Sequence, residues 1–360
     1  SGREMTDRVD LQIPVGGDFD GVRDVEIVLP AAPGARAAPT PAIERQAPAS
    51  GPGREAPRRA GWSWAPESWM DAGDRLLDEA AALDIGVLYV SVPLEEAGFD
   101  PDRLAGFIAD AGDRDIAVWA VEGDPSAVQA APRARFLRRT SALAAFNATR
   151  PEGQRLAGIQ YDIEPYLLPG YAADPAGWQE AYIETIAALR AAADMRTEVA
   201  IPFWFGRDGA GQDRLLDRLA PHVDGFAVMA YRTDVDELRG FVEPIFAWAE
   251  SGRRDIRIAL ESGPLPDRAN MMFLRRRVGE LWLIDFARDR LAILLHAAAA
   301  NPHGPAYQRQ TDWPVPADRI SFGGRRDALL AATRTLEADF SERPGFAGMA
   351  LHGVLDQTEP

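Results

Sequence analysis

From residue 61 onward, short apolar runs alternate with stretches whose apolar residues recur at helical spacing. The runs have the length and composition of buried strands. They lie at residues 61–64, 85–92, 116–123, 156–165, 198–205, 223–232, 257–264 and 346–355. Eight strands, each followed by a helix except at the end, predict an α/β fold of the (β/α)₈ type, the TIM barrel, over residues 61–360.

A doubly wound open sheet is the main alternative for this alternation of strands and helices. That fold does not require eight units, and the sequence has no glycine-rich phosphate turn after its first run at 61–64. Both observations favour the barrel.

Two further segments precede the predicted barrel. Residues 9–30 alternate apolar and polar side chains around a Gly-Gly-Asp turn, which predicts two strands. We treat residues 1–30 as a short β segment that could be the end of a preceding domain. Residues 31–60 are mostly Ala, Pro, Gly and Arg. Because such a stretch cannot bury enough apolar surface to offset its ordering entropy, we expect a flexible, disordered linker there and a barrel domain over 61–360.

The connection between the seventh and eighth runs, residues 265–345, is long. Its pattern predicts a helix over 275–300, then an irregular stretch and a second helix. Insertions of this kind lie on the face of a barrel where the loops after the strands shape the binding site.

The composition restricts the partners. The formal net charge is −16, and the acids are spread along the chain. A surface that binds nucleic acid or an anionic membrane needs an excess of basic residues, so neither is expected as the main partner. Lys is absent and Ala is very common, which indicates a bacterium with a high-GC genome.

The residue content also excludes some sites. Cysteine is absent, so disulfides and cysteine-ligated metal sites are excluded. No apolar run approaches the roughly 18 residues that a membrane-spanning helix needs. We expect a bacterial protein outside the cytoplasm. The first Met is Met5, and a signal peptide removed before Ser1 would leave no trace in this sequence.

Polar side chains occur at the C-terminal ends of several apolar runs, which is where the active site of a TIM barrel is built. In chain order, the runs from the third to the eighth provide Glu122, Asp124, Gln160, Asp162, Glu164, Tyr231, Glu261 and His352.

The fourth run carries three of these residues in alternation. Side chains at i and i+2 share a face of a strand and lie about 7 Å apart, so Gln160, Asp162 and Glu164 form a ladder that rises towards the mouth. Two carboxylates this close repel each other, and one is expected to keep its proton near neutral pH, as a general acid requires. The alternative is that both acids accept hydrogen bonds from loop amides or from an Arg.

Glu261 is a lone acid in the apolar seventh run, and a barrel brings it towards Glu164 across the mouth. Carboxyl groups about 5 to 5.5 Å apart suit a retaining double displacement, whereas a wider gap suits inversion. The alternative for Glu261 is an ion pair with Arg207, Arg232 or Arg257.

The Glu-Pro pair at 164–165 and the Glu at the end of the seventh run resemble the large retaining clan of glycoside hydrolases built on (β/α)₈ barrels. This resemblance implies that Glu164 is the acid/base, that Glu261 is the nucleophile and that Tyr231 orients it. The sequence departs from the clan at Ile163, where the clan has Asn.

The same stretch also resembles the chitinase-like family, whose fourth strand reads Asp-x-x-Asp-x-Asp-x-Glu. Asp162 and Glu164 match the last two positions, while Ala157 and Gln160 stand at the first two. The sequence Met-Ala-Tyr-Arg at 229–232 is similar to that family's Met-x-Tyr-Asp. This resemblance implies that the substrate's acetamido group is the nucleophile, that Asp162 positions it and that Glu164 donates the proton.

Aromatic residues near the strand ends favour a carbohydrate groove, in which flat rings contact the C–H faces of sugars. An ordinary core position is the alternative for each ring. Together with the polar residues, the candidates for substrate binding are Gln160, Glu122, Asp124, Trp62, Trp64, Tyr89, Trp204, Tyr166, Trp313 and His352.

Metal chemistry has weaker support. The four histidines, His222, His296, His303 and His352, are scattered, with no two at ligand spacing. Glu122 with the acids of the fourth run could supply only part of a Mg²⁺ site, so a metal-dependent lyase or hydrolase stays an alternative. We predict neither a metal nor a cofactor.

The sequence therefore predicts a glycoside hydrolase that cleaves a polysaccharide, with endo action and a carbohydrate as its partner. Glu164 would be the general acid/base, Asp162 its modulator and Glu261 the nucleophile or base. A non-catalytic, polysaccharide-binding barrel in an export or assembly system is the alternative. The sugar, the stereochemistry of cleavage and the oligomeric state are left open.

Overall fold

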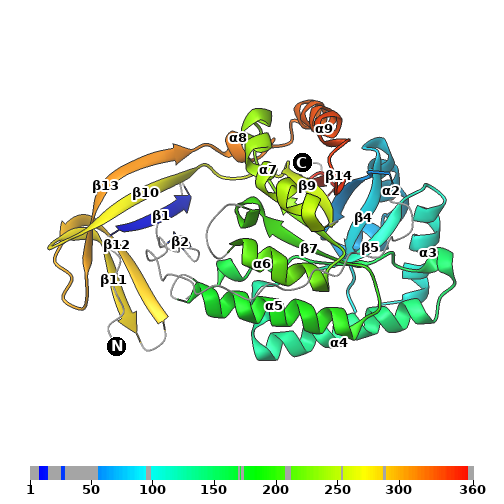
Figure 1. The fold of residues 1–360 in the computed structure, drawn as a ribbon, viewed down its shortest axis with the longest axis horizontal. Coiled ribbons are helices and arrows are strands. Elements are labelled where there is room, and N and C mark those ends of the chain that lie inside the picture. The colour runs from blue at the N-terminus through cyan, green and yellow to red at the C-terminus, as the bar shows by residue number, and fades with distance from the viewer. Residues whose placement is uncertain are drawn as a thin grey trace. The chain divides into compact units, whose positions relative to one another are not determined.

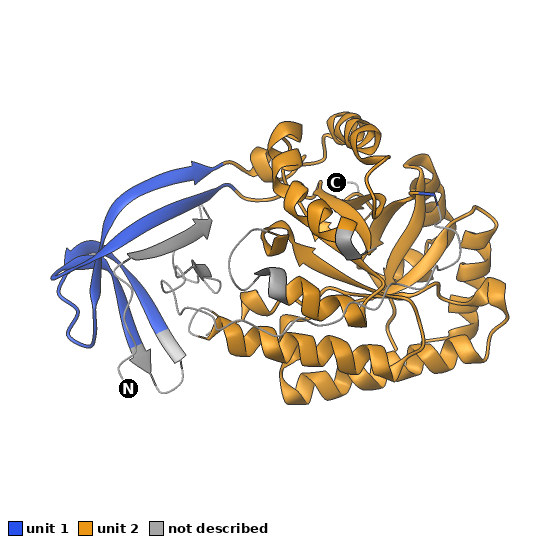
Figure 2. Ribbon diagram, viewed as in Figure 1, with its two compact units in different colours: residues 1–56, 267–315 blue, residues 57–266, 316–360 orange. Residues whose placement is uncertain are grey.

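The computed structural model describes residues 8–14, 26–28, 56–94, 99–168, 171, 174–206, 212–252, 254–286 and 289–355. The chain divides into two compact units (Figure 2), which are residues 1–56 with 267–315 and residues 57–266 with 316–360. This division differs from the expected barrel domain over 61–360, because the insertion at 267–315 belongs with the N-terminal strands. The expected linker over 31–60 lies outside the described residues as far as residue 55.

The larger unit is a closed barrel of eight parallel strands (Figure 1), which confirms the predicted TIM barrel. Each strand falls within or overlaps one of the eight apolar runs. In their order around the barrel the strands are β14 (Phe346–His352), β3 (Arg59–Ser63), β4 (Ile85–Ser91), β5 (Ala117–Glu122), β6 (Ile159–Tyr161), β7 (Thr197–Pro202), β8 (Gly225–Met229) and β9 (Asp255–Glu261).

Helices follow the strands and surround the barrel. The helices α3 and α5 begin at a proline that follows an aspartate. Asp100 accepts a hydrogen bond from the backbone N–H of Asp102 at 2.8 Å, and Asp174 accepts one from Gly177 at 3.0 Å. The α-helices are α1 (Pro66–Met70), α2 (Gly73–Ala82), α3 (Pro101–Gly112), α4 (Ala130–Ala148), α5 (Pro175–Ala192), α6 (Gln212–Leu219), α7 (Val235–Gly252), α8 (Ala317–Ile320) and α9 (Arg326–Phe340).

Short 3₁₀ helices continue the chain after several strands. They are η1 (Pro125–Val128), η2 (Glu152–Gln154), η3 (Pro165–Leu167), η5 (Phe203–Gly206) and η6 (Ala220–His222). Among the described residues, no helix is long and apolar enough to cross a membrane.

The fourth strand shows why its sequence alternates. Ile159, Tyr161 and Ile163 are each 1% exposed and pack in the layer between the strands and the helices. The Tyr161 hydroxyl hydrogen-bonds the Thr140 hydroxyl of α4 at 2.7 Å. Gln160 belongs to the opposite face and is fully buried inside the barrel. The strand is therefore anchored by its outward face and carries its polar residues inward.

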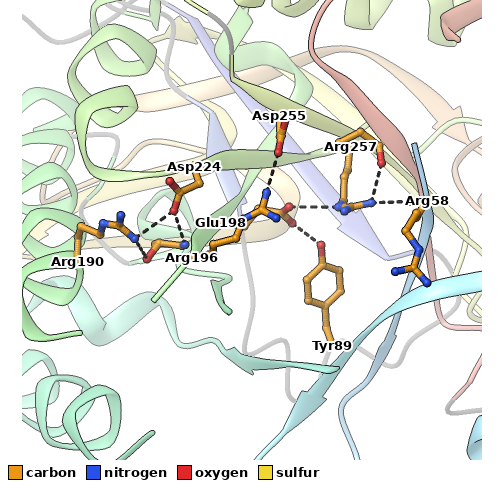
Figure 3. A network of polar contacts seen from close by, with 10 residues as sticks. Arg58, Tyr89, Arg190, Arg196, Glu198, Asp224, Asp255 and Arg257 are labelled. Atoms are coloured by element: carbon orange, nitrogen blue, oxygen red, sulfur yellow. Dashed lines mark hydrogen bonds and ion pairs between the residues drawn. The ribbon is translucent and has the colours of Figure 1, made fainter. Parts of the chain in front are cut away.

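A buried carboxylate joins the strands inside the barrel (Figure 3). Glu198 of β7 is 3% exposed, and its Oε1 accepts a hydrogen bond from the Tyr89 hydroxyl at 2.6 Å. The same Oε1 accepts a hydrogen bond from Gln160 Nε2, also at 2.6 Å. Its Oε2 lies 3.3 Å from Nε of Arg257, a residue of β9. Gln160 Oε1 in turn accepts from the indole N–H of Trp62 at 2.5 Å. Five strands of the barrel thus meet at one polar group.

Ion pairs also fix the N-terminal ends of the strands. Asp224 lies 3.1 Å from Arg190 of α5 and accepts the backbone N–H of Thr197 at 2.8 Å, and Arg196 pairs with Asp255 at 2.9 Å.

The smaller unit is an antiparallel sheet of six strands. In sheet order they are β12 (Asp289–Ala299), β11 (Gly279–Phe286), β13 (Ala306–Val315), β10 (Arg268–Arg276), β1 (Arg8–Pro14) and β2 (Glu26–Val28). Both strands expected within residues 9–30 are present, and β1 pairs with β10 of the insertion. Its buried cluster consists of Met271, Phe273, Leu281, Leu283 and Tyr307.

The helix predicted over 275–300 is wrong, because this segment forms strands. Leu281 and Leu283 are buried, whereas Glu280 before them and Trp282 between them are more exposed. This period of two is the pattern of a strand. Partner strands from outside the segment, β13 among them, complete the sheet.

The interior carboxylate is expected to dominate the stability of the barrel. Glu198→Gln removes the charge at nearly constant shape and leaves Arg257, whose side chain is 11% exposed, without its ion-pair partner. We expect the free energy of unfolding, measured by urea denaturation, to fall by about 3 kcal/mol. The control Glu180→Gln breaks an exposed pair with Arg218 and should cost less than about 1 kcal/mol. Equal losses in the two variants would contradict this interpretation.

Candidate active site

The C-terminal ends of the strands bring most of the predicted polar residues to one mouth of the barrel. Glu261 and His352 are the last residues of β9 and β14 and are direct partners in the parallel register of these strands. Asp162 and Glu164 follow β6, and Tyr231 follows β8. Residues far apart in the sequence therefore surround a single site.

Glu261 is a buried, hydrogen-bonded carboxylate with 5% of its surface exposed. Its Oε2 lies 2.7 Å from Nδ1 of His352, and its Oε1 accepts the backbone N–H of Gly263. Burial by itself would raise the pKa of Glu261. The hydrogen bond to His352, the positive charge of that imidazole when protonated, and the N–H groups of Gly263 and Ser262 outweigh burial, so the pKa is lowered. Glu261 is therefore ionised at neutral pH.

His352 connects Glu261 to the first strand of the barrel. Its Nε2 accepts a hydrogen bond from the indole N–H of Trp64 at 3.1 Å. The imidazole also packs against two rings, the edge of Trp62 at a centroid distance of 5.6 Å and the stacked ring of Tyr231 at 6.1 Å. The imidazole is thus held on both nitrogens and between two aromatic rings.

The environment of Asp162 differs from that of Glu261. Its backbone N–H donates to the Glu122 carbonyl at 2.9 Å, but its buried Oδ1 has no hydrogen-bond partner among the described residues. Burial raises the pKa of Asp162 from 3.8 to about 6, and a positive charge on His352, when that imidazole is protonated, opposes this only in part. One acid of the ladder was expected to hold its proton near neutrality. The group with the raised pKa is Asp162, and the cause is burial.

Gly123 lets the chain approach closely beside Asp162. A Cβ atom at this position would lie 3.0 Å from the Asp162 carbonyl oxygen and 3.2 Å from the Trp64 ring. A side chain there would push apart the ends of β5 and β6, so glycine keeps Asp162 and Trp64 in place.

Glu164 lies two residues further along, directly before η3. It accepts a hydrogen bond from the Tyr166 hydroxyl. Tyr166 in turn packs against the rings of Trp204 and Phe205, with centroid distances of 5.4 and 6.2 Å. Its aromatic neighbours therefore fix the group that orients Glu164.

Tyr231 links the three acids. Burial raises the pKa of Tyr231 well above its usual value, and the negative charges of Asp162, Glu261 and Glu164 raise it further. All three carboxyl groups are therefore close enough to act on the same phenol. The phenol stays protonated at neutral pH and can donate a hydrogen bond.

The remaining polar candidates lie below or beside this group. Gln160 is fully buried and is hydrogen-bonded at both ends of its amide, so it supports the floor of the site. Glu122 forms a bidentate pair with Arg139, at 2.7 and 2.8 Å. Asp124 caps η1 by accepting the Ser126 N–H at 2.7 Å.

The aromatic candidates are dispersed. Trp62 and Tyr89 are 3% and 0% exposed and stack on each other inside the barrel, with centroids 5.2 Å apart. Trp204 is 36% exposed beside Tyr166. Trp313 is 39% exposed but lies on β13 in the sheet unit.

Two cavities lie at different parts of the barrel. One of about 270 Å³ lies at the C-terminal end of β3 to β5, and its lining includes Trp64, Glu122, Asp124 and Arg135. A larger cavity of about 630 Å³ lies at the opposite end and is lined by residues such as Arg58. The smaller cavity therefore lies at the end of the barrel that carries the candidates Trp64, Glu122 and Asp124.

No metal centre is evident in the part of the chain that the structure describes, where no three His, Cys, Asp or Glu side chains are arranged to hold an ion. Of the acids at the mouth, Glu261 is hydrogen-bonded by His352 and the Gly263 N–H, and Glu164 by Tyr166.

Sequence reasoning missed three features of the site. Glu198 lies at the N-terminal end of its run, away from the mouth, and was not a candidate. The contacts of His352 with Trp64 and Glu261 depend on closure of the barrel between its first and last strands. Tyr182 of α5 has a buried hydroxyl without a partner among the described residues, and burial with the charges of Asp162 and Glu164 raises its pKa.

The fold and the site together define a TIM barrel whose C-terminal mouth carries Tyr231 and the carboxyl groups of Asp162, Glu164 and Glu261. No model of a protein family and no curated protein matches the chain. Among solved structures, the spore cortex-lytic enzyme SleL of Bacillus megaterium has 13% sequence identity, a TM-score of 0.44, and a match that covers 84% of this chain and 71% of that chain.

Two other similar structures are enzymes of other bacteria. A chitinase from Bacteroides thetaiotaomicron is 12% identical, with 82% of this chain and 89% of that chain covered and a TM-score of 0.42. A beta-mannanase from Streptomyces thermolilacinus is 16% identical, with 83% and 80% covered and a TM-score of 0.44. At these identities and TM-scores, the matches bear on neither substrate nor mechanism.

The burial of Asp162 should make stability depend on pH. Because its pKa is raised from 3.8 to about 6, the folded protein binds the proton more tightly than the unfolded chain. The carboxyl costs nothing below the unfolded pKa and progressively more as the pH rises through about 6. Asp162→Asn should therefore gain up to about 3 kcal/mol in free energy of unfolding at pH 8, and almost nothing near pH 4.

Urea denaturation at the two pH values measures this difference. The exposed Asp236→Asn is the control and should change stability by less than about 0.5 kcal/mol at either pH. A gain that does not vary with pH would show that the carboxyl of Asp162 is not the titrating group.

Proposed function

We propose that this protein is a glycoside hydrolase that cleaves a polysaccharide, with Glu164 as general acid/base and Glu261 as nucleophile. The observation that carries the proposal is the group of three carboxyl groups around Tyr231, in which Glu261 has a lowered pKa and Asp162 a raised one. Glycoside hydrolases combine carboxyl groups of different protonation behaviour beside the same bond, and Glu261 and Asp162 differ in this way. Glu164 is proposed as the proton donor from its position after β6, at the same barrel mouth as these two acids.

The proposed reaction has two steps. Glu164 gives its proton to the glycosidic oxygen as the bond from that oxygen to the sugar C1 breaks, and the Glu261 carboxylate forms an ester with C1. Glu164, now ionised, then takes a proton from water while the water oxygen attacks C1 and releases Glu261. Tyr231 can donate a hydrogen bond as charge changes on Glu261 and Asp162.

Asp162 supports a second route to the same cleavage. Its buried Oδ1 is an acceptor without a partner among the described residues, and an acetamido N–H of a substrate would satisfy it. In that route the acetamido oxygen attacks C1, Asp162 holds the amide, and Glu164 again donates the proton. Glu261 would then stabilise positive charge at the mouth without forming a bond.

The alternative of a different class is a barrel that binds polysaccharide without cleaving it. The exposed ring of Trp204 packs against Tyr166, whose hydroxyl donates to Glu164, and this favours contact with a sugar face in either case. Cleavage separates the two functions, because a binding module releases no new reducing ends. As a further part of the proposal, we place the protein outside the cytoplasm of a bacterium.

Glu164→Gln tests the acid. The amide keeps the shape of the side chain but has no proton to give, so kcat on a panel of soluble polysaccharides should fall by about 10²- to 10⁴-fold. Thermal unfolding and oligosaccharide binding by calorimetry should stay near wild type. Glu184→Gln, an exposed glutamate of α5 that pairs with Arg133, is the control and should retain full activity. Full activity in Glu164→Gln would overturn the proposal.

Glu261→Gln separates the two routes. If Glu261 forms the ester, kcat should fall by about 10⁴-fold or more, as happens when a nucleophile is removed. Turnover within about tenfold of wild type, restricted to substrates with a 2-acetamido group, would instead select the substrate-assisted route. The measurement is reducing-end release from matched polysaccharides with and without that group.

A further inference from the structure

We infer that Trp64 and His352 are positioning residues that hold one neutral tautomer of the imidazole against Glu261 and so fix the orientation of its carboxylate. The tautomer follows from the contacts alone. Only its kinetic consequence rests on the proposed role of Glu261.

The first step concerns the outer nitrogen of His352. An indole N–H is a hydrogen-bond donor and has no lone pair to offer. Since Trp64 Nε1 lies 3.1 Å from His352 Nε2, this Nε2 has to accept and cannot carry a proton. The imidazole is therefore neutral, and its single proton lies on Nδ1.

The second step concerns the inner nitrogen. Nδ1 lies 2.7 Å from Oε2 of Glu261, so its proton is donated to the carboxylate. The backbone N–H of Gly263 donates to the other oxygen, Oε1. Two donors from different segments thus fix the plane of the carboxylate, while each oxygen keeps lone pairs that can react.

The third step is the support of the imidazole itself. Trp62 contacts its edge, and Trp62 is held by Gln160 inside the barrel and by stacking on Tyr89. The Tyr231 ring stacks on the imidazole at an interplanar angle of 29°. Rotation of the His352 ring would disturb these contacts as well as both of its hydrogen bonds.

The charges around His352, taken alone, favour the imidazolium over the neutral imidazole. Glu261 of β9 and Asp162 after β6 both interact with the imidazole and would stabilise an imidazolium, and the Tyr231 phenol is neutral. A proton on Nε2, however, would point at the indole N–H of Trp64, which places two donors against each other. Trp64 therefore keeps His352 neutral between two acids. The negative charge of Glu261 is then not neutralised by a neighbouring cation.

The experiment observes the imidazole directly by NMR. The full chain is labelled with ¹⁵N-histidine, and two-bond ¹H–¹⁵N correlations identify which ring nitrogen carries the proton. The chain has four histidines, and the signals lost in His352→Gln assign this one. We expect a proton on Nδ1 and none on Nε2 in the wild type, with no conversion to imidazolium between about pH 8 and about pH 5.5.

Trp64→Phe keeps an aromatic ring beside the smaller cavity but removes the donor. In this variant His352 should gain a proton on Nε2 and become an imidazolium within the same pH range. Trp248→Phe is the matched control, since it removes an indole N–H that donates to Asp217 on the outside of the barrel. It should leave the His352 signals unchanged.

An imidazolium or an Nε2-protonated tautomer in the wild type would overturn the inference, as would an unchanged His352 in Trp64→Phe. These outcomes do not depend on activity. If the tautomer is as expected and no substrate is cleaved, the proposed function fails and the positioning contact stands. With activity, Trp64→Phe should lower kcat by about tenfold, with a smaller change in KM. The acidic limb of the pH profile should move to higher pH, because in this variant the neutral imidazole is lost to the imidazolium at a higher pH. A uniform loss without a shift of that limb would show a merely structural role.

Discussion

The carboxylate of Glu198 is buried inside the closed barrel, where a charge is stable only if the surrounding strands compensate it. Arg257 supplies the opposite charge, and Tyr89 and Gln160 supply hydrogen bonds. Gln160 also accepts a hydrogen bond from Trp62, and Trp62 packs on His352. Glu198 is therefore linked to the mouth by a chain of side chains that contact one another in space. The position of the site therefore depends on the contacts that stabilise the buried charge of Glu198.

At the mouth, different surroundings give similar side chains different properties. Glu261 and Asp162 are both largely buried carboxyl groups. The former receives hydrogen bonds from His352 and Gly263, and its pKa falls; the latter has an oxygen with no partner among the described residues, and its pKa rises. The negative charges of both acids contribute to the raised pKa of Tyr231. Carboxyl groups of different pKa beside each other are what hydrolysis of a glycosidic bond uses.

Much of the fold could be predicted from the sequence because buried parallel strands are short apolar runs, and all eight were recognisable before the structure. The direction of Gln160 followed from the two-residue period of its strand. The strands of the insertion were not predictable in the same way, because its apolar residues also fit a helix. In the structure Leu281 and Leu283 lie on the buried face of a sheet. Strands from other segments of the chain complete that sheet.

The limits of the site prediction have a similar cause. Although their catalytic roles stay predictions, the positions of Glu261, Tyr231 and the two acids after β6 at the ends of strands could be predicted from the run pattern. The partners of these residues could not, since His352 meets Glu261 and Trp64 only when the last strand pairs with both the seventh and the first. Gln160 was a candidate for binding substrate, and its amide is instead bonded within the barrel.

The most direct measurement of the central claim is the configuration of the first sugar product. The wild-type chain and Glu164→Gln are incubated with the same soluble polysaccharides, and the anomeric protons of released oligosaccharides are followed by NMR from the earliest times. Both proposed routes predict release by the wild type with retained configuration, and almost none by the variant. Initial release of the inverted anomer, or equal release by the two proteins, would contradict the account.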